Sequence, residues 1–207
     1  MMHTKPGDIE RTSLSIIRRE LEARGIVLPE ETAAVVKRVI HATADLDYAE
    51  NLRFTDGAVA RGVEALRRGR TLVTDTNMAL AGVSKPALSK LGGKALCLMA
   101  EPAVAAEARE RETTRAAVSM ERALAEYPDA VLAVGNAPTA LLKIAELLEA
   151  GSRPSLVIGV PVGFVNVVES KELIIGTDVP YIVARGRKGG SNVAAVICNA
   201  MLYQIMR

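Results

Sequence analysis

Aromatic side chains are scarce in this 207-residue sequence: they make up 3% of it, and tryptophan is absent. Proteins that bind single-stranded nucleic acids stack bases on aromatic rings, so this composition argues against that class. The formal net charge of +2 is too small to predict a polyanionic partner. No run approaches the roughly 20 apolar residues of a transmembrane helix, and the N-terminus lacks the apolar segment of a signal peptide. We therefore expect neither a nucleic-acid nor a membrane partner.

Cysteine and histidine are scarce as well, with two residues of each. Cys97 and Cys198 lie in apolar stretches, which is typical of buried free thiols in a reducing cytoplasm. Two distant cysteines and two histidines, His3 and His41, do not make a zinc site. The Gly-x-Ser-x-Gly elbow of hydrolases is missing, as are the Walker and Gly-x-Gly-x-x-Gly loops of nucleotide-binding proteins. We expect no metal site and a cytoplasmic location.

Apolar residues make up 49% of the sequence, enough for a packed core, and the length favours one domain over residues 1–207. The first third is predicted to be helical. An amphipathic segment ends at Gly25, a second begins at Pro29, and a third ends at Gly69, which are typical residues for helix boundaries.

Short, almost continuously apolar runs follow, as expected of strands that are buried on both faces. Helical stretches over residues 110–127 and 138–151 separate some of these runs. Such alternation predicts an α/β fold with a parallel sheet of about five strands and helices on both sides. The predicted strands are residues 71–75, 94–100, 130–135, 155–160 and 181–186.

Parallel sheets bind ligands beyond the carboxyl ends of their strands, and all five predicted strands are followed there by glycine, proline or short polar residues. In "GNAPTALLKI" a helix start follows the strand that ends at Gly135, and its free N–H groups are expected to favour an anion. "GRKGGSN" places Arg187 and Lys188 beside two glycines, where a carboxylate or phosphate can bind. An ordinary solvated turn remains the alternative for each loop, and for Arg187.

His41 lies in "KRVIHATADLDYAE", within a predicted helix. Asp45, four residues later, is expected to share its helix face and to orient the imidazole. Lys37 and Arg38, one turn earlier, oppose protonation of the ring. Imidazole exchanges a proton near neutral pH, but spacing alone leaves open whether His41 is catalytic or a partly buried helix residue.

Seven ordered blocks between about residues 9 and 203 carry a resemblance to a known family. They are "IERTSLSII", "KRVIHATAD", "TDTNMALAGV", "TTRAA", "GNAPTAL", "GVPVGFVNVVESKE" and "GRKGGSNVAAVICNA". Together they closely resemble the precorrin-8X methylmutase family of cobalamin biosynthesis.

The resemblance implies a single three-layer α/β/α domain with a mainly parallel, Rossmann-like sheet and an N-terminal helical segment. It also implies an isomerase that shifts a methyl group from C-11 to C-12 of a tetrapyrrole-derived corrin precursor. No cofactor is consumed, and any cobalt arrives inside the substrate. The family is homodimeric, with active sites completed across the interface. The blocks favour the cobalt-precorrin-8 branch; the metal-free reaction of precorrin-8X to hydrogenobyrinate is the alternative, and a corrinoid-binding protein without catalysis is a further one.

Residue by residue, the resemblance implies that His41 protonates or hydrogen-bonds the ring nitrogen beside the migrating methyl group. Ser13 matches a serine that contacts the substrate, and Arg115 matches an arginine that reaches the partner's substrate. Thr12 stands where the family often has arginine, so one rim carboxylate is expected to be held differently. Further matches to substrate-binding positions are Asn77, Met78, Asn136, Thr139, Gly189, Gly190 and Ser191.

Overall fold

The structure is a computed structural model that describes residues 6–206, so His3 lies outside the described range. The helices are α1 (Pro6–Ala23), α2 (Glu30–Thr43), α3 (Tyr48–Asn51), α4 (Ala58–Arg67), α5 (Asn77–Gly82), α6 (Lys85–Lys90), α7 (Pro102–Glu110), α8 (Arg115–Glu126), α9 (Pro138–Glu149), α10 (Val167–Ile175) and α11 (Ser191–Ile205). The strands are β1 (Leu52–Phe54), β2 (Leu72–Thr74), β3 (Ala95–Leu96), β4 (Val131–Val134), β5 (Leu156–Gly159) and β6 (Tyr181–Ala184).

The strands form one sheet in the order β1-β6-β5-β4-β2-β3. Neighbours from β6 to β3 are parallel, whereas β1 runs antiparallel to β6. The prediction of a mainly parallel sheet is confirmed, but the described sheet has six strands instead of about five. The sequence did not indicate β1, a three-residue edge strand with the exposed Arg53 at its centre. The predicted strand at 94–100 is reduced to two half-buried residues at the other edge.

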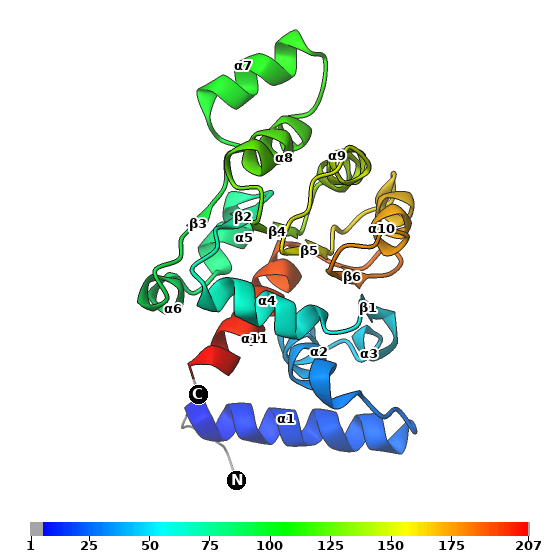
Figure 1. The fold of residues 1–207 in the computed structure, drawn as a ribbon. Coiled ribbons are helices and arrows are strands. Elements are labelled where there is room, and N and C mark those ends of the chain that lie inside the picture. Colours follow the sequence, from blue (N-terminus) through cyan, green and yellow to red (C-terminus); the bar gives the residue numbers. More distant parts are fainter. Residues whose placement is uncertain (1–5, 207) are drawn as a thin grey trace.

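Helices cover both faces of this sheet (Figure 1), as predicted. Along β4, Val131 and Ala133 face one core, and Leu132 and Val134 face the other. The first core includes residues of α2, α4 and α11, and the second includes residues of α8, α9 and α10. In Figure 1, α1 lies outside α2, and α7 projects beyond α8 at the opposite end of the molecule.

The packing of α1 on α2 is important because these helices carry two predicted site residues. Ile17 and Leu21 of α1 are buried in the same core as Val36 and Ile40 of α2. Burial of each such side chain contributes about 1.5–3 kcal/mol. Ser13 precedes Ile17 by four residues, so it lies on the same face of α1, toward α2.

Candidate active site

Ser13 and His41 meet where α1 crosses the C-terminal turn of α2. The hydroxyl oxygen of Ser13 lies 2.7 Å from Nδ1 of His41. This contact fixes the plane of the imidazole, and in either tautomer it uses the Nδ1 side of the ring. No hydrogen bond to Nε2 is found among residues 6–206, which leaves that nitrogen for a ligand.

A hollow of about 550 Å³ opens beside this pair. Its walls are mainly aliphatic, and the polar groups among its lining residues include Thr12, Ser13, Glu20 and His41. Such a surface suits the face of a large, mostly apolar ligand. The imidazole of His41 lies at one point of this surface. The lining residues are Ile9, Thr12, Ser13, Ile16, Ile17, Glu20, Ile40, His41, Ala44 and Leu46.

The expected pairing of Asp45 with His41 is wrong. Helix α2 ends at Thr43, and Ala44 is left-handed with φ of 54°, so Asp45 no longer follows the helix face of His41. Instead, Lys188 donates to Asp45 at 2.7 Å and to Asp47 at 2.6 Å. The hydrogen bond from Lys188 lowers the pKa of the Asp45 carboxyl, and both carboxylates raise the pKa of Lys188. This ion cluster joins the end of α2 to the loop before α11.

The amides before α9 are not free for an anion from outside, contrary to prediction. The carboxylate of Asp75, directly after β2, accepts the N–H groups of Gly135, Asn136 and Ala137 at 2.9, 2.8 and 2.7 Å. Burial raises the pKa of the Asp75 carboxyl, although the three N–H groups act in the opposite direction. Asp75 was not predicted as a site residue; its sequence signal is a lone acidic residue ending the apolar run "TLVTD".

The glycines before α11 meet the protein's own backbone. A Cβ atom at Gly189 would lie 2.1 Å from the carbonyl oxygen of Val160, so this position requires glycine for packing. The N–H of Gly190 also donates to Val160 at 2.8 Å. The Ser191 hydroxyl is buried and lies 2.8 Å from that of Thr76. The close backbone approach expected at this loop is therefore to the residue after β5, and it ties the loops after β2, β5 and β6 together.

Other predicted binding residues are exposed at the carboxyl edge of the sheet. Asn77 and Met78 form the first turn of α5, and Asn136 precedes α9. Arg187 is exposed too, with its guanidinium 5.4 Å from the centroid of the Phe164 ring. Phe164 was not predicted; it is 82% exposed, and its sequence signal is an apolar "GFV" in a strand-exit loop.

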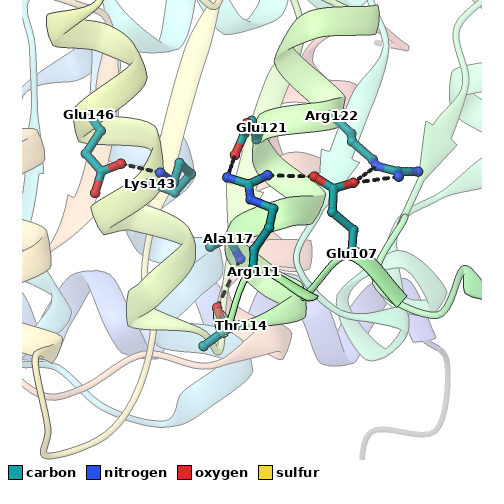
Figure 2. Close-up of polar contacts among 8 residues, drawn as sticks. All are labelled: Glu107, Arg111, Thr114, Ala117, Glu121, Arg122, Lys143 and Glu146. Carbon is teal, nitrogen blue, oxygen red and sulfur yellow. Dashed lines mark hydrogen bonds and ion pairs between the residues drawn. The ribbon is translucent and has the colours of Figure 1, made fainter. Parts of the chain in front are cut away.

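Arg115 is exposed at the first position of α8, on the opposite side of the sheet from α2. It is therefore not part of the Ser13–His41 hollow within one chain. Figure 2 shows how the α7–α8 hairpin beside it is held: Arg111 donates to Glu107 and Glu121, and Arg122 donates to Glu107.

The N-cap Thr114 further fixes the start of α8. Its hydroxyl accepts the N–H of Ala117 at 3.1 Å and donates to Thr139 at 2.9 Å. Thr139 thus lies beside Arg115 and belongs to the same region of the surface.

Residues 6–206 contain no group of three or more His, Cys, Asp or Glu side chains placed to hold a metal ion. None of their helices has the length and apolarity needed to cross a bilayer. The mainly parallel sheet with helices on both faces defines an α/β fold, a class that binds its ligands at the carboxyl edge of the sheet.

Comparisons with known proteins give the particular family. The precorrin-8X methylmutase family model matches residues 8–204. The chain is 42% identical to the cobalt-precorrin-8 methylmutase of Salmonella typhimurium, over 97% of this chain and 96% of that one. It is 41% identical to the precorrin-8X methylmutase of Pseudomonas aeruginosa, over 93% of each chain. The solved precorrin-8X methylmutase of Thermus thermophilus superposes with a TM-score of 0.86 at 37% identity, covering 96% of this chain and 97% of that chain. The chain belongs to the precorrin-8X methylmutase family.

Proposed function

We propose that this protein moves a methyl group from C-11 to C-12 of a corrin precursor, converting cobalt-precorrin-8 to cobyrinate in cobalamin biosynthesis. The observation that carries the proposal is the Ser13–His41 pair at an apolar hollow, in a chain of the methylmutase family. The substrate and product are isomers, so the reaction needs no acceptor and no co-reactant.

His41 is the catalytic residue in this proposal. The C-11–methyl bond breaks and the C-12–methyl bond forms, while electrons shift through the ring. An imidazole that gives or shares a proton with the neighbouring ring nitrogen polarises the macrocycle and favours this shift. Ser13 occupies Nδ1, so Nε2 is the nitrogen that faces the substrate. The aliphatic walls of the hollow hold the corrin ring in place and exclude water from it.

The acetate and propionate arms of the substrate require donors around the rim. Arg187, exposed beside Phe164, is suited to one arm because guanidinium binds carboxylate with two parallel hydrogen bonds. Arg115 is suited to another only if it comes from a neighbouring subunit, since α8 and α2 cover opposite faces of the sheet. We therefore propose a homodimer whose active sites are completed across the interface.

The metal state of the substrate distinguishes cobalt-precorrin-8 from precorrin-8X. Relatives at about 40% identity carry both names, cobalt-precorrin-8 methylmutase and precorrin-8X methylmutase. The blocks "KRVIHATADLDY", "TDTNMALAGVSK" and "GRKGGSNVAA" favour the cobalt branch. We propose that any cobalt arrives with the substrate, that no other cofactor takes part, and that the enzyme works in the cytoplasm, where its two free cysteines stay reduced.

The test is to incubate the purified protein separately with cobalt-precorrin-8 and with metal-free precorrin-8X and to follow the visible spectrum. The shift changes the conjugation of the ring, so conversion changes the spectrum. We expect faster conversion of the cobalt substrate. Faster conversion of precorrin-8X would assign the protein to the metal-free branch. Pigment that binds tightly without any spectral change would indicate a binding protein and contradict catalysis.

A further inference from the structure

Lys171 of α10 is a buried cation that the proposed reaction does not use. Its side chain is fully buried, and its ammonium donates to the carbonyl oxygens of Gly186 at 2.7 Å and Lys188 at 2.8 Å. The ion pairs found among residues 6–206 do not include it. Burial lowers the pKa of Lys171 to about 8, because a cation loses its hydration in the interior.

Both carbonyl groups belong to the loop of residues 185–190, between β6 and α11. The loop turns at Gly186, where φ is +82°, and at Gly190, where φ is +135°. Its C-terminal end is anchored just beyond β5, since the N–H of Gly190 donates to the carbonyl oxygen of Val160. The carbonyl groups of Gly186 and Lys188 accept hydrogen bonds from the buried ammonium of Lys171, which therefore fixes the middle of the loop.

The side chain of Lys188 in this loop reaches the segment between α2 and α3, beside the candidate active site. Lys188 is exposed and binds Asp45 and Asp47 at 2.7 and 2.6 Å. These carboxylates directly follow α2, whose last turn carries His41. A continuous series of contacts therefore leads from Lys171, through the loop backbone and Lys188, to the end of the helix that carries His41.

We propose that Lys171 is a positioning residue for substrate binding: it orients the loop so that Lys188 reaches Asp45 and Asp47. The cluster then sets the rim of the hollow beside His41. This inference rests on the proposed function only in taking that hollow as the place where the corrin binds.

An apolar side chain would fill the same space but would leave two buried carbonyl groups without donors, which is unfavourable. A buried charge without a carboxylate partner also opposes folding. A lysine that merely filled the core would not account for the convergence of two carbonyl groups on its ammonium, one of them from Lys188 itself. A positioning role accounts for it.

The experiment compares Lys171→Met and Lys188→Met with the double variant, by measuring KM, kcat and Tm with the corrin substrate that wild type converts. The matched control is Ile174→Ala, one turn further along α10. Ile174 is fully buried in the core that α8, α9 and α10 form on the sheet. We expect each lysine variant to raise KM about tenfold, which corresponds to about 1.4 kcal/mol, with kcat within about threefold of wild type. We expect Ile174→Ala to lower Tm and leave KM unchanged.

Coupling between the two lysines decides the question. If Lys171 acts through Lys188, the double variant has the KM of the more impaired single variant. A KM increase that multiplies in the double variant, or a Lys171→Met enzyme with wild-type KM, contradicts the inference. Should Lys171→Met fail to fold, Lys171→Gln takes its place in the assay. Glutamine keeps a hydrogen-bond donor, so we expect a smaller rise in KM. A wild-type KM for Lys171→Gln would also contradict the inference. Wild-type turnover and its loss in His41→Ala test the proposed function separately.

Discussion

The hydroxyl oxygen of Ser13 lies 2.7 Å from Nδ1 of His41 across the contact between α1 and α2. The two residues are 28 positions apart in the chain, and the burial of Ile17 and Ile40 holds their helices together. The contact leaves Nε2 as the nitrogen that can meet a substrate. The orientation of the His41 ring thus depends on the docking of the N-terminal helix.

Ser13→Ala removes this hydrogen bond and leaves the imidazole free to turn. A hydrogen bond of this kind contributes about 1 kcal/mol, so we expect kcat to fall by about fivefold, with little change in Tm. Ser15→Ala is the control, because residue 15 lies two positions further along α1 and does not share the face of Ser13. Steady-state kinetics of both variants check the prediction, and equal kcat values in the two would contradict it.

The central strands could be predicted because the runs at 130–135, 155–160 and 181–186 are apolar on both faces. The edge strand β1 could not, since it owes its conformation to pairing with β6 and not to its own three residues. The helix starts and ends were predicted from glycine and proline, and Gly25 and Gly69 both have the left-handed φ of 70° expected at such ends.

The site was less predictable, for a physical reason. His41 and Ser13 were predicted as site residues from the family resemblance, but the partner of Asp45 depended on a left-handed Ala44 that helical spacing does not reveal. Lys171 lies in "ESKELII" and reads as an ordinary charge on a helix surface. Only the folded chain brings two carbonyl groups of a distant loop to its ammonium.

Asp75→Asn is expected to destabilise the protein. One carboxylate oxygen accepts the N–H of Gly135, and the other accepts the N–H groups of Asn136 and Ala137. An asparagine would place its NH2 group, which is also a donor, against at least one of these N–H groups. We expect the free energy of unfolding to fall by about 2 kcal/mol in urea denaturation. Asp178→Asn, where the side chain is 80% exposed, should change it by less than about 0.5 kcal/mol. Equal stability of the two variants would mean that Asp75 does not hold this loop.

Lys171 should make stability depend on pH in a defined direction. Its pKa falls from 10.5 in the unfolded chain to about 8 in the fold, so the unfolded chain binds more protons between these values. The contribution of Lys171 to the free energy of unfolding therefore rises with pH, by about 2 kcal/mol between pH 7.5 and 10. Urea denaturation of wild type and Lys171→Met at both pH values measures it. The difference between the two proteins should shift in favour of wild type at pH 10; a constant difference is the contrary result.

Mixed dimers test whether Arg115 acts across a subunit interface. Arg115→Ala and His41→Ala are each expected to be strongly impaired when pure. Mixing the two chains should restore activity, up to one working site per mixed dimer, because that site combines His41 of one chain with Arg115 of the other. Mixtures that stay as inactive as the pure variants would contradict the shared site. A tagged copy of each chain, purified in sequence, isolates the mixed dimer for the assay.

His41 is the residue on which the proposed methyl shift depends most directly. The decisive measurement is single-turnover conversion of the corrin substrate by His41→Ala, followed through the visible spectrum. We predict that the variant still binds the pigment but converts it about 10²–10⁴ times more slowly than wild type, the usual contribution of a group that transfers or shares a proton. Conversion at the wild-type rate would show that His41 does not drive the methyl shift.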